Sequence, residues 1–317
     1  MFTFRKYEGN PILTPDDYNW DMGHRNIMFP CVVEMRQHLP DAIDRFYLYL
    51  AAHSGKGIGL ATAPHPLGPW RMYSDNPVLS LESVSPPFRG HISSPELVVV
   101  NREHRLHLYF HGPCEFPGRG GQMTGLATSS DGVHFTPYAE NPILPTAPKG
   151  AWDASMTAYL RVLRYGEGFI GLYMGHDGTP PKRPGVAQSS EGVAISTDGI
   201  RWEKWAGNPL LTVGDGDFGG IRHVALLRED DNLYIVYSPR TADDLETEVL
   251  RLARVRLGET PNDWSAAEKL GTLLEPSAPW ERQELRDPFI LRHENRLYLY
   301  YAGGNEAGLG VAVAELD

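Results

Sequence analysis

Four acidic residues of this chain stand in surroundings that suit general acid–base chemistry. Glu96 is the lone charge in the apolar run PELVVV, where burial is expected to raise the pKa of its carboxyl group. Asp287 follows Arg286 in LRDPFIL, and the guanidinium should keep that carboxylate ionised. We therefore expect Glu96 to act as the acid and Asp287 as the base or as an orienting carboxylate. Asp153 in GAWDAS takes the remaining role, unless it merely holds a turn, and Glu284 is an alternative proton donor.

Three histidines follow corresponding apolar segments: His53 in AAHSG, His111 in FHGP and His176 in GHDG. If those segments are equivalent strands, the three side chains lie around one rim, where we expect them to contact the substrate. Ordinary loop histidines and a metal site are the alternatives. No His-x-x-x-His or Glu-x-x-His spacing links these three residues, so neither a metal nor a cofactor is predicted.

The other candidates are polar residues at the starts of predicted first strands or, for Arg240, at the end of a second strand. A single polar residue is common at the start of a strand and is weak evidence for a site. Polar residues from five strands that converge on one centre would line a binding site. Arginines there could also grip an anionic group, such as a carboxylate, a sulfate or inorganic phosphate. Besides the three histidines, the predicted binding residues are Arg25, Asn26, His91, Ser94, Arg222, His223, Arg240 and Arg286.

A repeated phrase, aromatic-x5-Asn-Pro-(Ile/Val/Leu)-Leu, indicates the elements that must position these residues. It occurs as FRKYEGNPIL, WRMYSDNPVL, FTPYAENPIL and WEKWAGNPLL. Intervals of 66, 65 and 67 residues separate Asn10, Asn76, Asn141 and Asn208, and WSAAEKLGTLLEP is a weaker fifth copy. A fixed period of this length marks a repeat architecture. Apolar residues alternate within each period, so each unit is expected to be a small antiparallel sheet.

Each period contains the same succession of strands. LRDPFILRHENRLYLYYAGG gives two strands joined by a polar turn, a third follows as in GLGVAVAEL, and the Asn-Pro phrase is the outer fourth. Gapless alignment of the repeats places His223 and Glu96 at the position of Asp287. The last unit lacks a fourth strand, whereas residues 4–13 have no strands before them. The chain is therefore predicted to be all-β, a single five-bladed β-propeller over residues 1–317, with four-stranded antiparallel blades and a ring closed by the N-terminal strand.

The composition argues against several classes of function. The chain has 29 Lys+Arg against 40 Asp+Glu and a net charge of −11, which disfavours nucleic acid as a partner. No apolar stretch reaches membrane-spanning length or resembles a signal peptide, so no membrane partner and a cytoplasmic location are expected, with a secreted origin not excluded. Two cysteines are too few for a disulfide framework. The oligomeric state is left open, a homodimer included.

The Asn-Pro-Ile-Leu phrases, the turns SSDGVHF (129–135) and STDGIRW (196–202), the RDP strand start and the LYLYY strand together resemble glycoside hydrolase families 43, 32, 68, 117 and 130. The resemblance covers essentially the whole chain. It implies a sugar site in a funnel at one end of the central axis, with carboxylates delivered by different blades and Asp287 as a base or orienting group. Two positions depart from the family 43 pattern: Phe29-Pro30 in the first blade and His223 in the fourth. The resemblance to family 117 would permit His223 to act as the proton donor.

The sequence thus predicts a glycoside hydrolase that cleaves an oligosaccharide or the end of a polysaccharide, by an inverting acid/base mechanism with carboxylates in the axial funnel. Inversion asks for two carboxyl groups roughly 6.5–9.5 Å apart, one protonating the leaving oxygen and one activating water. A carbohydrate substrate is the expected partner. Two alternatives stay open: a phosphorylase resembling family 130, which needs a cationic phosphate pocket, and a carbohydrate-binding propeller without catalytic activity.

Overall fold

The computed structural model describes residues 2–100, 105–179, 189–214, 217–241, 247–258 and 263–316, without the side chains of Phe218, Arg240 and Thr241. Within these ranges α1 (Leu81–Val84) is the only α-helix, and short 3₁₀ turns lie at Pro15–Asp17, Met35–Gln37 and Pro279–Glu281. The strands pair almost entirely in the antiparallel sense, so the predicted all-β class is confirmed. No helix in the described part of the chain is both long and apolar enough to cross a membrane.

The strands form sheets that follow one another along the chain. The first contains β2 (Met28–Glu34), β3 (Phe46–Ala51), β4 (Gly57–Ala63), β5 (Arg71–Met72) and β6 (Leu79–Ser80). The second contains β7 (Ser93–Val99), β8 (Leu106–Phe116), β9 (Arg119–Ser129) and β10 (Thr136–Pro137). A parallel contact of β9 with β11 joins it to β11 (Met156–Tyr165), β12 (Gly168–His176), β13 (Ser190–Ser196) and β14 (Glu203–Lys204).

Two further sheets have four strands each. One contains β16 (Ala225–Glu229), β17 (Asn232–Tyr237), β19 (Leu250–Arg256) and β20 (Glu268–Leu274). The other contains β21 (Leu285–His293), β22 (Arg296–Gly303), β23 (Gly308–Glu315) and β1 (Arg5–Lys6). In this sheet Arg5 lies opposite Val313 and Lys6 opposite Ala312, so the N-terminal strand is the fourth strand of the C-terminal sheet. The short strands β15 (Asp217–Phe218) and β18 (Arg240–Thr241) pair with each other.

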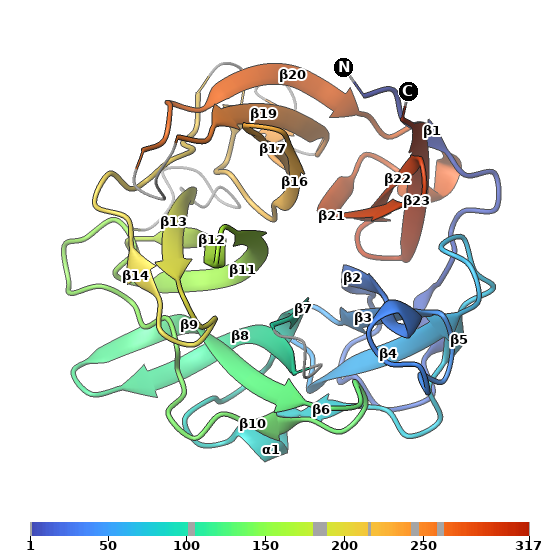
Figure 1. Cartoon of the computed structure of the whole chain (residues 1–317), viewed down its shortest axis with the longest axis horizontal. Helices are drawn as coiled ribbons and strands as arrows, with labels where there is room; N and C mark the ends of the chain where they lie inside the picture. The colour runs from blue at the N-terminus through green and yellow to red at the C-terminus, as the bar shows by residue number, and fades with distance from the viewer. Residues whose placement is uncertain are drawn as a thin grey trace.

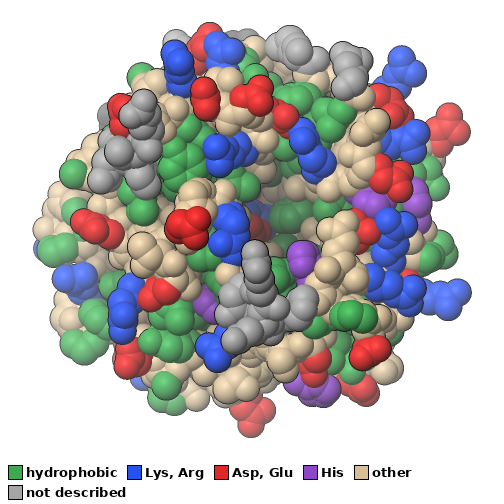
Figure 2. Space-filling model, viewed as in Figure 1, with side chains coloured by type: hydrophobic (Ala, Val, Ile, Leu, Met, Phe, Trp, Pro, Cys, Tyr) green, Lys and Arg blue, Asp and Glu red, His purple; other side chains and the backbone are tan. Residues whose placement is uncertain are grey.

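The sheets surround a common centre, with the first strand of each sheet innermost and the two chain ends side by side (Figure 1). Each of these first strands contacts the next in the order β2, β7, β11, β16 and β21, and β21 in turn contacts β2. At the turn ends of the first strands the centre holds a cavity of about 380 Å³, lined among others by Val32, Glu34, Leu163 and Leu291. Figure 2 shows one face of the molecule hollowed near its centre, with charged and histidine side chains around the hollow.

The Asn-Pro phrase closes a sheet through the asparagine side chain. The amide of Asn76 accepts a hydrogen bond from the N–H of Leu60 at 2.8 Å and donates one to its C=O at 2.9 Å. Asn10, Asn141 and Asn208 hold the third strands of their sheets in the same two-way manner. The outer strand is therefore shorter than the phrase that predicted it. Only two residues pair as a strand before the chain turns, and beyond them the asparagine side chain makes the hydrogen bonds to the third strand.

Candidate active site

Five residues, one at or just before the start of each first strand, have left-handed backbone conformations. They are Phe29, Ser94, Tyr159, His223 and Asp287, with φ of 59°, 58°, 57°, 48° and 52°. Left-handed φ is unfavourable for residues other than glycine and is often found at functional sites. The ring of Tyr159 lies 4.6 Å from that of His223 and 5.7 Å from that of Phe29, measured between centroids. We therefore take the strand-start end of the axis as the candidate active site.

His223 and Asp287 are adjacent at this end of the axis, as the alignment of their repeats predicted. His223 Nδ1 lies 2.6 Å from Asp287 Oδ1, and both side chains are buried. Burial opposes ionisation of Asp287, but His223 and then Arg286 outweigh it and lower the pKa of this carboxyl group. Burial also lowers the pKa of His223, and Asp287 only partly offsets the effect. An ionised aspartate beside a neutral imidazole follows, with the imidazole oriented by the carboxylate.

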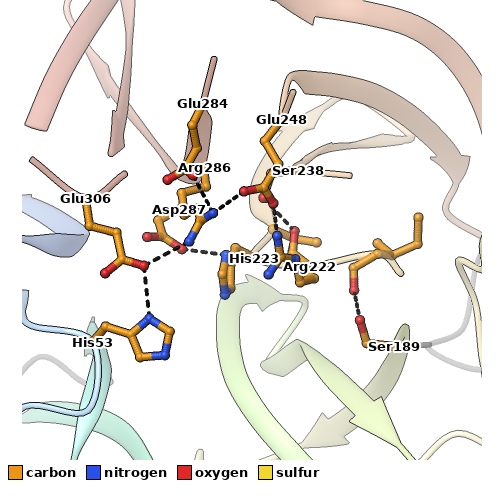
Figure 3. A network of polar contacts seen from close by, with 12 residues as sticks. His53, Ser189, Arg222, His223, Ser238, Glu248, Glu284, Arg286, Asp287 and Glu306 are labelled. Atoms are coloured by element: carbon orange, nitrogen blue, oxygen red, sulfur yellow. Dashed lines mark hydrogen bonds and ion pairs between the residues drawn. The ribbon is translucent and has the colours of Figure 1, made fainter. Parts of the chain in front are cut away.

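An ion-pair network surrounds Arg286 beside this pair (Figure 3). Arg286 Nη2 lies 2.7 Å from Glu284 Oε2, and Nη1 donates to Glu306 Oε1 at 2.9 Å. Arg286 also contacts Glu248, whose other carboxylate oxygen contacts Arg222. Because carboxylates hold both arginines, these described residues carry no excess of positive charge.

Glu284 is the member of the network best suited to keep a proton. Burial raises the pKa of its carboxyl group, repulsion from Glu306 and Asp287 adds to the rise, and Arg286 opposes it. Its Oε1 is buried and makes no hydrogen bond to the described residues. Glu284 therefore offers an acid next to the ionised Asp287, and such a separation of pKa values marks acid and base roles.

His53 and Asn26, both predicted binding residues, extend the network to the first sheet. His53 Nδ1 lies 2.9 Å from Glu306 Oε1, and this hydrogen bond raises the pKa of His53. The N–H of His53 donates to Asn26 Oδ1 at 2.6 Å. The side chain of His53 remains 56% exposed, so its ring can meet a ligand from solvent.

On the β7–β10 side of the axis, predicted binding residues form an uncharged group. Ser94 and His111 are 2% and 1% exposed, and neither Ser94 Oγ nor His111 Nδ1 has a hydrogen-bond partner among the described residues. The ring of His91 lies 5.9 Å from that of His111. Burial lowers the pKa of His91 and holds that of His111 well below its usual range, so both imidazoles are neutral at neutral pH.

The structure corrects the placement of Glu96, because Ser94 occupies the position that the alignment gave to it. Six residues lie between the paired Val99 and Leu106, but only four between Arg292 and Leu297, so the alignment slipped by two. The side chain of Glu96 lies further along the axis, toward the central cavity.

There Glu96 Oε2 accepts a hydrogen bond from Arg161 Nη1 at 2.8 Å, and Oε1 accepts one from the N–H of Val162 at 3.1 Å. Arg161 Nε also donates to the C=O of Val224, and its guanidinium lies over the ring of Phe289. Burial raises the pKa of Glu96, as expected, and Arg161 opposes the rise. The predicted acid is therefore a partner in a buried ion pair that links several sheets.

The structure also corrects Asp153, which it does not bring to the axis. Its buried Oδ2 accepts hydrogen bonds from Tyr173 Oη at 3.0 Å and from Lys204 Nζ at 2.6 Å in the outer strand β14. Tyr301 binds Glu281 in the same way, with Lys6 of β1 as the cation. This repeated cluster of acid, tyrosine and lysine ties an outer strand to the second strand of its sheet, so Asp153 holds the fold.

Two further predicted binding residues, Arg25 and His176, lie apart from the network. Arg25 is 80% exposed and pairs with Asp16. His176 Nδ1 accepts a hydrogen bond from the N–H of Gly178 at 2.7 Å, which makes it a turn residue. The side chain of Arg240 lies outside the described residues.

The sequence did not point to Glu248, Glu306, Tyr159 or Glu191. The repeat period could have identified Tyr159, because intervals of 65 and 64 residues separate it from Ser94 and His223. Glu191 in β13 is fully buried, and neither of its carboxylate oxygens has a partner among the described residues. Burial raises its pKa well above the usual value, and Arg161 opposes the rise. In the described residues no group of three or more His, Cys, Asp or Glu side chains is arranged to hold a metal ion.

No protein-family model matches the chain. The uncharacterized protein R118 of Acanthamoeba polyphaga mimivirus is 26% identical in an alignment of 322 residues, which covers 90% of this chain and 83% of that protein. A thermostable family-43 glycoside hydrolase matches at 15% identity with a TM-score of 0.66, over 93% of this chain and 90% of its own.

Two further solved structures match over almost their whole length. An N-acetylgalactosamine deacetylase from F. plautii, in complex with blood group B trisaccharide, has a TM-score of 0.71 at 14% identity over 98% of this chain and 95% of its own. A structure from a study of glycoside hydrolase family 130 and β-1,2 mannosidic linkages has a TM-score of 0.68 at 14% identity, over 100% of this chain and 97% of its own. The chain thus shares its fold with these structures, which include the glycoside hydrolases that the resemblance implied.

Proposed function

We propose that this protein is a glycoside hydrolase built on a five-bladed β-propeller, with its active site at the strand-start end of the axis. The contact of His223 Nδ1 with Asp287 Oδ1 at 2.6 Å, beside Glu284, whose pKa is raised by burial, is the observation that carries the proposal. The ring of contacts among the first strands and the pairing of β1 with β23 support the blade count and the closure.

In the proposed mechanism Glu284 is the general acid and His223 the general base. Glu284 gives its proton to the leaving glycosidic oxygen while the bond from that oxygen to the anomeric carbon breaks. Neutral His223 takes a proton from the water that attacks the anomeric carbon from the opposite side, which inverts its configuration. Asp287 is completely buried, so it acts as a positioning residue that orients His223 and stabilises the imidazolium.

The charge balance of the site favours hydrolysis over phosphorolysis. Inorganic phosphate needs unpaired cations, but Arg222 and Arg286 are bound to carboxylates in the described network. Phosphate would also meet the negative charges of Glu248 and Glu306. Water, which is uncharged, meets no such repulsion. The opposite pKa shifts of Glu284 and Asp287 likewise favour an enzyme over a binding protein without activity.

The test is hydrolysis of a panel of neutral oligosaccharides and aryl glycosides, with and without inorganic phosphate. We expect Glu284→Gln and His223→Asn each to lower kcat at least about a hundredfold, the usual contribution of a general acid or base. Glu268→Gln, on the exposed face of β20, is the matched control and should behave as wild type. Phosphate should change neither rate nor product. Release of a sugar phosphate, or near-normal turnover by both site variants, would refute the assignment.

A further inference from the structure

Three polar groups on the β7–β10 side of the axis are buried without hydrogen-bond partners among the described residues. They are Ser94 Oγ, His111 Nδ1 and Gln122 Oε1, from β7, β8 and β9 of one sheet. A buried polar group without a partner costs about 1–3 kcal/mol, so a set of three calls for water or a ligand that satisfies them. We refer to Ser94, His111 and Gln122 together as the neutral pocket.

The chemistry of the neutral pocket suits hydroxyl groups. A serine hydroxyl, a primary amide and a neutral imidazole each both donate and accept hydrogen bonds. Burial has the largest influence on the pKa of His111, followed by His91, His223, His53 and Gln122, and none of these four is a carboxylate. A sugar hydroxyl, which also donates and accepts, complements such groups, whereas a carboxylate or sulfate only accepts and needs a cation.

The rings beside the neutral pocket add apolar surface. The ring centroid of Tyr159 lies 4.1 Å from that of His111, and the centroid of Phe29 lies 6.4 Å from it. Aromatic rings at a binding site can pack against the C–H face of a pyranose or furanose ring. The same rings also contact the proposed base, because the centroid of His223 lies 4.6 Å from that of Tyr159 and 5.6 Å from that of Phe29.

We propose that the neutral pocket binds one uncharged sugar unit of the substrate through its hydroxyl groups, so that the enzyme acts on neutral glycosides and rejects uronic acids. This inference rests on the proposed function for its role in catalysis, but its binding step can be measured alone. Two described features support the rejection of uronates: the lack of a cation in the neutral pocket, and the pairing of Arg222 and Arg286 with carboxylates.

The test is equilibrium binding of monosaccharides to the protein. Calorimetry and the imidazole ¹⁵N signals of His111 measure the binding. The probes are glucose, galactose, mannose, xylose and arabinose, with glucuronic and galacturonic acid as the charged counterparts. We expect at least one neutral sugar to shift the His111 signals. We also expect each uronate to bind at least about tenfold more weakly than its neutral counterpart, which corresponds to roughly 1.4 kcal/mol.

Two variants probe the neutral pocket with little risk to the fold. Ser94→Gly removes the hydroxyl at a φ of 58°, where glycine is favoured, and Gln122→Leu removes the amide at similar volume. Each should weaken sugar binding about five- to tenfold, the effect of a lost hydrogen bond. His134→Ala, whose side chain is 82% exposed, is the control and should bind like wild type.

The outcomes separate this inference from the proposed function. Tighter binding of uronates, or no shift of the His111 signals by any probe, overturns the inference even if hydrolysis is found. Binding of a neutral sugar that both variants weaken, without hydrolysis of any substrate, supports the neutral pocket and overturns the proposed mechanism instead.

Discussion

Glu191 should make the protein less stable as the pH rises from mildly acid to neutral. Its carboxyl group is fully buried, has no hydrogen-bond partner among the described residues, and has a pKa well above the usual value of 4.5. In the unfolded chain the same group ionises near 4.5. Between these two pKa values the unfolded state binds fewer protons than the folded state. The free energy of unfolding therefore falls by about 1.4 kcal/mol per pH unit for this one residue.

Glu191→Gln should remove this dependence while keeping the size of the side chain. Over two pH units, from about pH 5 to about pH 7, the stability of the variant relative to wild type should rise by about 3 kcal/mol, as long as the folded carboxyl stays protonated. Below the unfolded pKa the relative stability should not change with pH. The quantity measured is the change with pH of the stability difference between variant and wild type. A free-energy cost of burying the amide that does not depend on pH cancels in this quantity.

Urea unfolding at several pH values, with Glu140→Gln as the exposed control, measures the effect. Glu140 lies at a surface turn, so its variant should keep the pH dependence of wild type. If Glu191→Gln and wild type differ by the same amount at every pH, Glu191 ionises normally in the folded state and the reasoning from burial is wrong.

Three further predictions concern the site and the closure of the sheets. Asp153→Asn should destabilise the protein by about 3–5 kcal/mol, because Lys204 loses its buried partner, and urea unfolding measures this effect. The kcat of the folded enzyme should stay near that of wild type, which a turnover assay measures. Glu306→Gln removes a negative neighbour that raises the pKa of Glu284, so the alkaline limb of the kcat/KM pH profile should move to lower pH. Deleting residues 1–13 exposes the edge of β23 and should broaden and lower the thermal transition, and a truncated protein that melts like the intact one would contradict this.

The sequence was informative where neighbouring repeats have equal length. The repeats that contain β16 and β21 align without a gap, and His223 and Asp287 were correctly placed at one position and found in contact. The same procedure failed for Glu96, because the chain between the paired Val99 and Leu106 is two residues longer than that between the equivalent pair Arg292 and Leu297. A shift of two residues keeps a side chain on the same face of a strand, so the hydrophobic pattern could not reveal the error.

Other site residues could be recognised only in three dimensions. Asp153 looked catalytic because it is an acidic residue at a strand start, but the structure shows that Tyr173 binds it as Tyr301 binds Glu281. Glu248 and Glu306 come from loops that differ between repeats, so no periodic signal marks them. Their role depends on Arg286, which brings them together across the sequence.

The pairing of β1 with β23 also determines the order in which the protein can be completed during synthesis. Arg5 and Lys6 are made well before their partners Val313 and Ala312, because about three hundred residues lie between them. A growing chain can form its earlier sheets one after another, since the strands within each are close in sequence. During this time the N-terminal segment stays unpaired, and Phe2 and Phe4 are not yet packed against the final sheets. Until β23 is made, the N-terminal segment lacks its partner strand and exposes an unpaired edge, and chains in this state are prone to pair with each other.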